Sequence, residues 1–321
     1  MFRFGVMGAG SIAGKFVDAV RQLPDCEVTA IASRSADRAA EFAARNGIGA
    51  AYGSYAAMLT VEKQDAVYIA THTSSHAELT RLCIAHDIPV LCEKAMFTNA
   101  AEARGVLAMA HERGVFCMEA MWSRFLPAVQ EMKRRLDEGA IGEPRYAELA
   151  IGWQPPRDNE NRFFDPAKGG GAAYDLTVYC YELADLFLGK PDAVEHVSVL
   201  WGETGVDETE TVTLRWSEPK ACLATLSASI VTSLRERAVI CGTEGSLFMP
   251  RPHMAEGFTI VHQDGTQENW QDTQTVNGFV YEVAEVMRCV RAGLVESPVV
   301  PHELTIRCAE MFDVINATRE E

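Results

Sequence analysis

The chain has 321 residues, of which 45 are acidic and 29 are basic, so its formal net charge at pH 7 is -16. A surface this negative repels nucleic acids and anionic membranes, which excludes both as main partners and leaves small molecules as the expected ligands. No apolar run approaches the roughly 20 residues that span a bilayer and no signal peptide opens the chain, so we expect a soluble cytoplasmic protein.

The first predicted elements are a strand, a glycine-rich turn and a helix that begins at Ser11. Gly8, Gly10 and Ala13 fit the spacing G-x-G-x-x-G/A, in which glycines let backbone amides approach a pyrophosphate. The free N–H groups at the start of the helix favour the phosphate charge. We therefore predict a dinucleotide cofactor against Gly8, Gly10, Ser11 and Ile12; the alternative is a glycine-rich turn without a ligand.

The second predicted strand covers residues 27–32 and precedes a helix over residues 36–46. An NAD-specific site would place Asp or Glu at the end of this strand, against the ribose 2′-hydroxyl. Ser33 and Arg34 occupy that place, and Arg38 follows one helical turn later. These side chains are suited to a 2′-phosphate, so NADP(H) is the predicted cofactor, with NAD(H) as the alternative. Both arginines would otherwise be a solvated start of the helix.

Two further strands, residues 66–70 and 89–92, are expected to end at the ligand-binding edge of the same sheet. The loop after the first is predicted to line the cofactor through Thr71, His72, Ser74 and His76. His72 and His76 stand four apart, but a loop and not one helix lies under both, so no metal site is expected. The second strand ends in two charged residues, Glu93 and Lys94. A helix over residues 99–113 and a strand over residues 115–118 complete a doubly wound parallel sheet of the Rossmann type, in a dinucleotide-binding domain over residues 1–121.

Residues 122–321 show a different pattern, in which strands follow one another without long helices between them. Such runs predict an α+β domain with a large, mostly antiparallel, open-faced sheet, which we expect to bind substrate. Residues 169–171 are three glycines that introduce one interrupting helix over residues 174–188. The strand over residues 221–231 carries few charges, and an uncovered apolar face would be hidden by pairing two copies of the sheet. A homodimer through this sheet is therefore predicted.

Five motifs together resemble the family of glucose-fructose oxidoreductase, inositol dehydrogenase and rhizopine-catabolism (Gfo/Idh/MocA) oxidoreductases over essentially the whole chain. The pattern is most similar to the branch of dimeric dihydrodiol dehydrogenase and 1,5-anhydrofructose reductase, whereas many other branches carry His where this chain has Tyr179. The motifs are residues 8–13, Glu93 with Lys94, residues 118–125, residues 169–175 with Tyr179, and residues 242–245.

The resemblance implies an NADP-dependent oxidoreductase that transfers hydride between nicotinamide and a carbonyl or hydroxyl group of a sugar, polyol or dihydrodiol. Reduction of a carbonyl builds negative charge on oxygen, so the site needs a proton donor and a cation. Tyr179 and Lys94 are suitable groups, and Asp175 shares a helical face with Tyr179 and would steady the lysine. Further site residues are Trp122 (cofactor and substrate), Arg124 and Arg162 (cofactor), Glu93 (cofactor) and Phe164 (substrate).

The chain departs from the family at Ala95, because the family has proline after the Glu-Lys pair. A proline would rigidify the turn that presents the lysine, so we expect Lys94 to be less tightly fixed here. A second function stays open, that of a non-catalytic NAD(P)-binding sensor, since the family resembles in fold a repressor of a galactose pathway. Retention of Lys94, Asp175 and Tyr179 favours the enzyme.

Overall fold

The structure, a computed structural model, describes residues 1–61, 63–157 and 161–319. The chain forms two compact units, each built from two pieces of sequence. Unit 1 contains residues 1–122 and 276–306, and unit 2 contains residues 123–275 and 307–321. None of the helices within the described ranges combines the length and the apolar character needed to cross a membrane.

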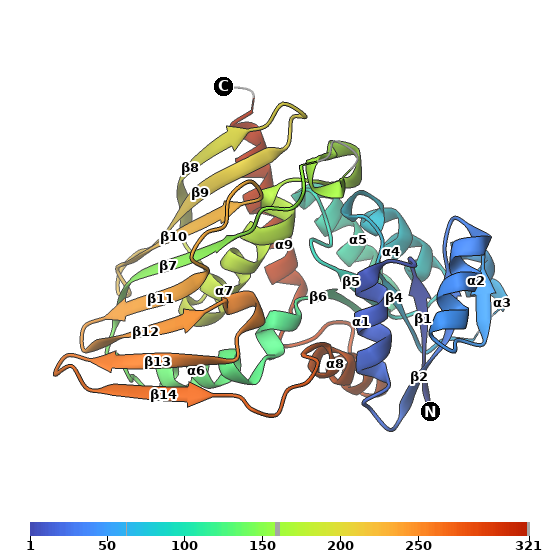
Figure 1. The fold of residues 1–321 in the computed structure, drawn as a ribbon, viewed down its shortest axis with the longest axis horizontal. Helices are drawn as coiled ribbons and strands as arrows, with labels where there is room; N and C mark the ends of the chain where they lie inside the picture. The colour runs from blue at the N-terminus through green and yellow to red at the C-terminus, as the bar shows by residue number, and fades with distance from the viewer. Residues whose placement is uncertain (62, 158–160, 320–321) are drawn as a thin grey trace. The chain divides into compact units, whose positions relative to one another are not determined.

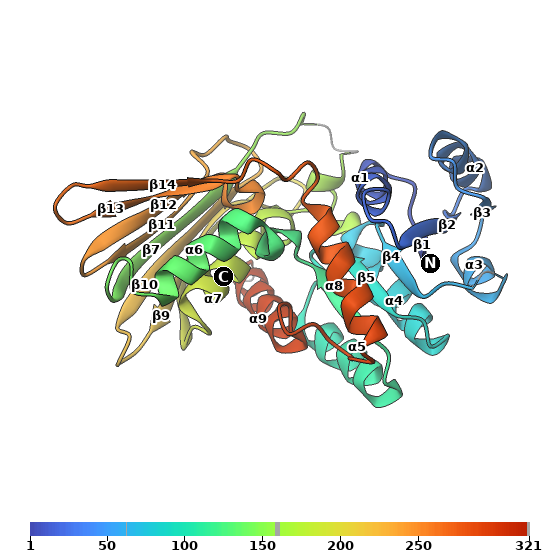
Figure 2. The same cartoon turned by 90° about the horizontal axis from the view of Figure 1, so that it is seen from below.

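Unit 1 contains a six-stranded parallel sheet, of which β1, β2, β4, β5 and β6 are labelled in Figure 1 and β3 in Figure 2. Strand β1 lies at the centre of the sheet. Strands β2 and β3 follow on one side of it, and β4, β5 and β6 follow on the other. This reversal creates the switch point at which open α/β sheets bind ligands. The predicted Rossmann sheet is confirmed. The strand order is β3 (Ala50–Tyr52), β2 (Cys26–Ala32), β1 (Phe2–Met7), β4 (Ala66–Ile69), β5 (Val90–Glu93) and β6 (Cys117–Ala120).

Helices between and after these strands bury apolar faces that build the core of unit 1. The Phe16 ring of α1 stacks on the Tyr68 ring of β4 with 3.9 Å between centroids, and Phe4 of β1 meets Phe16 edge-on. Helix α4 packs against α5. The helices are α1 (Ser11–Val20), α2 (Ala36–Arg45), α3 (Tyr55–Val61), α4 (His76–Ala85), α5 (Ala100–Arg113) and α8 (Phe279–Arg291).

The position of helix α8 differs from the predicted domain boundaries, which placed every residue after 121 in the second domain. In the structure α8 belongs to unit 1 and packs against α1. The Asn277 side chain donates a hydrogen bond to the carbonyl of Lys15, and Phe279 stacks on Trp122. The apolar face of this amphipathic helix therefore completes the core of the dinucleotide-binding unit, although the helix follows the second sheet in sequence.

Unit 2 contains an eight-stranded sheet in which only β7 and β10 pair in parallel and the other neighbours are antiparallel. The predicted large, mostly antiparallel sheet is confirmed. Its last three strands were not predicted. The order is β14 (Gln267–Gln271), β13 (Gly257–His262), β12 (Gly245–Pro250), β11 (Arg237–Gly242), β7 (Pro144–Gly152), β10 (Cys222–Ser229), β9 (Asp207–Trp216) and β8 (Ala193–Trp201).

One face of this sheet carries helices, and Figure 2 shows α6 and α7 on that side. Side chains alternate along β9 and β10, so that Val212, Leu214, Ala224 and Leu226 are buried while their neighbours are exposed or half-buried. This alternation is typical of a sheet with one covered face. The helical elements of unit 2 are α6 (Pro127–Asp137), the π-helical turn η5 (Ala173–Thr177), α7 (Val178–Leu188) and the part of α9 (His302–Ala317) from residue 307 onward.

Candidate active site

The glycine turn after β1 has the geometry expected of a pyrophosphate site. Gly8 has a φ of +106°, and a Cβ there would lie 2.4 Å from the carbonyl oxygen of Ala70, so only glycine fits. Gly10 is the N-cap of α1, with no atom within 4 Å of the place a Cβ would take. The first turn of α1, from Ser11, holds no acidic residue and no capping side chain. Its N–H groups are therefore available to an anion.

Arginine side chains follow the end of β2, as predicted for a 2′-phosphate site. The N–H of Gly8 donates to the carbonyl of Ala32 at 2.9 Å, which fixes this strand end beside the glycine turn. Ser33 is buried, whereas Arg34 and Arg38 are exposed and form no ion pair with any described residue. Burial raises the pKa of the neighbouring Tyr55, and the positive charges of Arg34 and Arg38 oppose that rise.

The predicted cofactor loop after β4 contains both accessible and buried side chains. Ser74 is exposed, and Thr71 and His72 are half-buried. His76 is buried, which corrects its prediction as a cofactor ligand: its Nδ1 lies 2.8 Å from the carbonyl of Ala95 and its Nε2 lies 3.2 Å from the carbonyl of Thr71. Burial lowers the pKa of His76 to about 4, so the ring is neutral, and we assign its proton to Nδ1, which donates to Ala95.

The turn that presents Lys94 is held by two buried side chains. His76 bonds the carbonyl of Ala95, and Glu119 of β6 accepts a hydrogen bond of 2.8 Å from the N–H of Met96. The second Glu119 oxygen accepts a hydrogen bond of 2.8 Å from the Thr305 hydroxyl. The Lys94–Ala95 peptide bond is cis. Both polar groups of the Ala95–Met96 peptide are thus held by buried side chains from distant parts of the sequence, and the expectation that Lys94 is less tightly fixed stays a prediction.

Glu93, also predicted at the cofactor, lies in a buried acidic cluster with Tyr68 and Glu282. Tyr68 donates a short hydrogen bond to Glu93, and Glu282 of α8 is fully buried with neither carboxyl oxygen hydrogen-bonded to a described residue. Burial, followed by the charge of Glu93, raises the pKa of Glu282 well above its ordinary value. Burial thus favours the protonated form of Glu282, and the Glu93 carboxyl group is already hydrogen-bonded by Tyr68.

Trp122 and Arg124 lie close in sequence but have different surroundings. The Trp122 ring is half-buried and stacks on Phe279 with 5.2 Å between centroids, so one of its faces is fixed within unit 1. Arg124 is buried in unit 2, where its guanidinium donates to the carbonyl of Glu182 at 2.7 Å and pairs with the Glu182 and Asp185 carboxylates at 3.3 and 3.8 Å. The cofactor role predicted for Arg124 is therefore corrected: its charge neutralises buried carboxylates.

Asp175 and Tyr179 occupy the π-helical turn η5 and the first turn of α7. Asp175 pairs with Arg162 at 3.2 Å, and the Arg162 guanidinium lies 3.8 Å from the centroid of the Phe163 ring. Tyr179 is 7% exposed and its ring lies 5.4 Å from the ring of His253. Within unit 2, the predicted cofactor residue Arg162 thus serves as the charge partner of Asp175. π-helical turns are frequent at functional sites.

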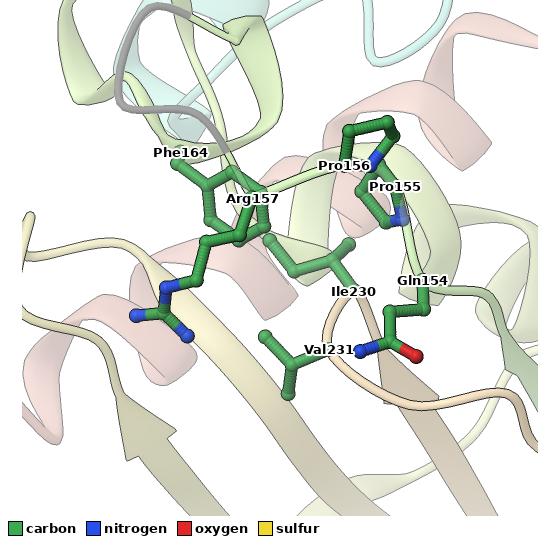
Figure 3. Close-up of a pocket in the computed structure, with 7 residues that line it drawn as sticks. All are labelled: Gln154, Pro155, Pro156, Arg157, Phe164, Ile230 and Val231. Atoms are coloured by element: carbon green, nitrogen blue, oxygen red, sulfur yellow. The ribbon is translucent and has the colours of Figure 1, made fainter.

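A hollow of about 330 Å³ lies at the carboxyl ends of the parallel strands β7 and β10. Figure 3 shows the Phe164 ring and Ile230 beneath the segment of Pro155 and Pro156, with the Arg157 guanidinium on the opposite side from the Gln154 amide. The guanidinium pairs with Glu208 at 2.9 Å. The hollow is therefore mostly apolar and carries a neutralised charge pair, and it contains Phe164, a predicted substrate residue. Its lining comprises Gln154, Pro155, Pro156, Arg157, Phe164, Ile230 and Val231.

Comparison with known proteins identifies the family of this fold and site. Residues 2–121 match the family model described as the NAD-binding Rossmann fold of the oxidoreductase family, and residues 129–248 match the model of the GFO/IDH/MocA C-terminal domain. The chain belongs to the Gfo/Idh/MocA oxidoreductase family. The family predicted from the sequence motifs is thereby confirmed.

Relatives of this Gfo/Idh/MocA oxidoreductase align over nearly its whole length. Trans-1,2-dihydrobenzene-1,2-diol dehydrogenase of Mus musculus is 36% identical over 97% of this chain and 95% of its own, and the Homo sapiens protein of that name is 34% identical over 93% and 91%. KijD10, a 3-ketoreductase from Actinomadura kijaniata crystallised with NADP and TDP-benzene, superposes with a TM-score of 0.89 at 28% identity, over 98% of this chain and 97% of its own.

Several supporting residues of this oxidoreductase were not predicted from the sequence. Glu119 is a carboxylate inside an otherwise apolar strand, and Glu282 lies on the apolar face of an amphipathic helix. Both patterns are visible in the sequence, because a charged residue at a core position requires a buried partner or a proton. For Phe279, which supports Trp122, the spacing of apolar residues predicts only a core position.

Proposed function

We propose that this chain is an NADP(H)-dependent oxidoreductase that transfers hydride between nicotinamide and a carbonyl or hydroxyl group of a sugar, polyol or dihydrodiol-like substrate. The observation that carries the proposal is the retention of Lys94, Asp175 and Tyr179 at the positions of the family motifs, together with the buried anchors of the Lys94 turn. The bound cofactor supplies the hydride. We assign the cofactor's pyrophosphate to the N-terminus of α1.

In the proposed reaction Tyr179 donates a proton to the oxygen that gains charge as hydride arrives at the carbonyl carbon. Lys94 contributes a cation that stabilises the same oxygen. Asp175, paired with Arg162 in unit 2, orients this group of side chains. In the reverse direction Tyr179 accepts the proton of the hydroxyl group while hydride leaves for the cofactor.

The charges around the hollow of unit 2 support an uncharged substrate. Arg157 is paired with Glu208 and Arg162 with Asp175, so both cations already have partners. A neutral ring pays little desolvation free energy when it is buried against Phe164 and Ile230. A diphosphate would have to displace a carboxylate from an arginine. We therefore propose that neutral sugars, diketones and dihydrodiols are better substrates than nucleotide-linked sugars, although the similar ketoreductase was crystallised with TDP-benzene.

A cofactor oxidation assay tests this function. Purified protein is mixed with NADPH and a panel of neutral sugars, osones and diketones, and with NADP⁺ and trans-dihydrodiols for the reverse reaction. Turnover of at least one neutral substrate is expected, with none or less for a nucleotide-linked ketosugar. Tight NADPH binding without turnover of any member would favour the alternative, a non-catalytic cofactor sensor.

Replacing Arg34 with Ala is expected to weaken NADP(H) binding about 10- to 100-fold and to change NAD(H) binding by less than about threefold. The reason is that a charge-assisted hydrogen bond to the 2′-phosphate contributes about 1.5–3 kcal/mol, and NAD(H) lacks that group. Calorimetric titration of both cofactors measures the difference. Arg45→Ala, at the exposed far end of α2, is the control and should change neither affinity. Wild-type protein that binds NAD(H) as tightly as NADP(H) would contradict the assignment.

We also propose that the open face of the unit 2 sheet forms a homodimer. Tyr146, Leu223 and Phe248 are 42%, 46% and 42% exposed there, and strand register places Tyr146 of β7 opposite both Leu223 of β10 and Cys241 of β11. Val239 of β11 stands opposite Phe248 of β12, so apolar side chains form a band across four strands. Exposed apolar patches of this kind mark interaction surfaces.

The expected result is a dimer mass for the wild type in light scattering at micromolar concentration, and a monomer mass for Leu223→Lys, because two buried ammonium groups would face each other across the interface. Val314→Lys adds the same charge on the exposed side of α9 and should leave the dimer intact. A monomeric wild type would overturn the proposal.

A further inference from the structure

A register shift in β9 turns two carboxyl groups toward η5, the turn that carries Asp175. Leu200 of β8 pairs with Thr209, but its neighbour Trp201 pairs with Asp207, so Glu208 is an extra residue in β9. Such a bulge re-aims the side chains on one side of it. Asp207 and Glu210 consequently both point to the covered face of the sheet, where they are 3% and 1% exposed.

Asp207 holds the first N–H groups of the helical segment. Its Oδ2 accepts a hydrogen bond of 2.6 Å from the N–H of Ala173, and the N–H of Ala172 is a further donor. Gly171, with a φ of +119°, allows this approach, since a Cβ there would lie 2.0 Å from Asp207 Oδ1. Helix N-termini favour a negative charge, so an ionised Asp207 acts as a cap supplied by a distant strand.

Glu210 holds the other end of the same turn. Its Oε1 accepts a short hydrogen bond from the Thr177 hydroxyl, and its Oε2 is buried and accepts no hydrogen bond from a described donor. Burial and the adjacent Asp207 carboxylate raise the pKa of Glu210 well above its ordinary value, whereas the pKa of Asp207 rises only to about 6. Burial of two adjacent carboxyl groups therefore favours a proton on Glu210 over one on Asp207.

We propose that Asp207 and Glu210 are positioning residues that hold η5 and the start of α7, and thereby fix Asp175 and Tyr179 for the proposed hydride-transfer reaction. Neither carboxyl group is assigned a contact with substrate or cofactor. Their effect passes through the backbone of residues 172–177, which lies between the two anchors and carries Asp175. This inference rests on the proposed function for its catalytic part, while the anchoring itself can be measured without turnover.

The test compares two isosteric substitutions. Asp207→Asn removes the charge and leaves one acceptor oxygen for the N–H groups of Ala172 and Ala173, so kcat is expected to fall about 10- to 100-fold, as misplacement of reacting groups by about 1 Å costs about 10²-fold. Glu210→Gln keeps the oxygen that accepts from Thr177 and, like a protonated Glu210, carries no charge, so it should keep kcat within about threefold. Glu195→Gln on the exposed part of β8 is the surface control and should match the wild type.

Two further readouts separate positioning from a loss of folded protein. Amide hydrogen exchange over residues 172–178 should accelerate in Asp207→Asn and stay unchanged in Glu210→Gln. NADP(H) affinity should be unchanged in both variants. The pH profile of kcat should shift only in Asp207→Asn. A merely structural defect would instead lower the folded fraction and leave the pH profile of the folded enzyme unchanged. If Asp207→Asn does not fold, Thr177→Val removes one bond of the same turn and should lower kcat of the folded protein.

The inference would be overturned if Asp207→Asn showed the kcat and the amide hydrogen exchange of the wild type. The same holds for Thr177→Val if that variant replaces Asp207→Asn. A Glu210→Gln variant that loses as much kcat as Asp207→Asn would also overturn the inference. Gln mimics the protonated, uncharged Glu210 that is assigned to the anchor, so it should hold the turn. If the wild type turns over no substrate of the panel, the proposed function fails, and the exchange measurement still decides whether the pair holds the turn.

Discussion

Tyr179→Phe is expected to lower kcat at least about 10²-fold on the best substrate, with NADP(H) affinity within about twofold of the wild type. The substitution removes one hydroxyl group from a side chain that is 7% exposed, so it deletes the proposed proton donor and leaves the packing against His253 in place. General acid catalysis contributes about 10²- to 10⁴-fold, which sets the size of the loss. Steady-state kinetics and cofactor titration measure both quantities.

Lys94→Ala should lower kcat by a similar factor, and the double variant should fall well short of the product of the two losses, because in the proposed reaction both groups act on the same oxygen. Tyr181→Phe, two residues along α7 and also buried, removes a hydroxyl that interacts with Arg307 and should keep wild-type kcat. Tyr179→Phe with wild-type kcat would mean that the proton comes from another group.

Arg124→Ala is expected to lower the free energy of unfolding by about 3–5 kcal/mol, since it leaves carboxylates of Glu182 and Asp185 buried without one of their cations. Arg124 and Glu182 side chains are 7% and 0% exposed, and Arg307 continues to pair with Asp185 at 2.5 Å. Urea denaturation gives the difference. Arg134→Ala on the exposed surface of α6 also breaks two ion pairs and should cause a much smaller change, because solvent screens them.

The loss of unfolding free energy caused by Arg124→Ala should become larger as the pH rises. Burial raises the pKa of Glu182 from 4.5 to about 7, and Arg124 opposes that rise. Between these values the folded protein binds a proton that the unfolded chain releases, so this group's contribution to stability falls as pH rises. Without Arg124 the folded pKa is higher still, so the deficit should be nearly constant well below pH 7 and should grow as the pH rises through about 7. A deficit that shrinks toward high pH would contradict a charge-pairing role.

The central strands of both sheets were predicted because their apolar residues recur in runs or alternate. Strands β12, β13 and β14 were not predicted. β14 reads Gln-Glu-Asn-Trp-Gln, which lacks an apolar pattern because an edge strand of a one-sided sheet buries few side chains. β3 has three residues, too few for a period to be recognised. Local patterns thus predicted most of the elements that build the cores, but not β12 and β13, whose Leu247, Met249 and Ile260 are also buried.

The glycine turn after β1, the exposed place of Arg34 after β2 and the position of Lys94 after β5 could be predicted because each depends on a short stretch of sequence, while their roles stay proposals. Arg124 could not, since its guanidinium is neutralised by Glu182, 58 residues away along the chain. His76 was assigned to the cofactor on its place in a loop, yet it reaches Ala95, 19 residues away. Whether a polar side chain faces a ligand or a buried partner depends on contacts between distant segments, which one sequence does not specify.

Helix α8 makes unit 1 discontinuous in sequence, and this order matters while the protein is being synthesised. The helix that covers α1 and brings Phe279 to Trp122 is translated only after all of residues 123–275. At about 5–20 residues per second the ribosome needs roughly ten to thirty seconds for that stretch. During this interval the nascent dinucleotide-binding unit carries an unfinished apolar surface, on which chaperones can act and from which misassembly can begin.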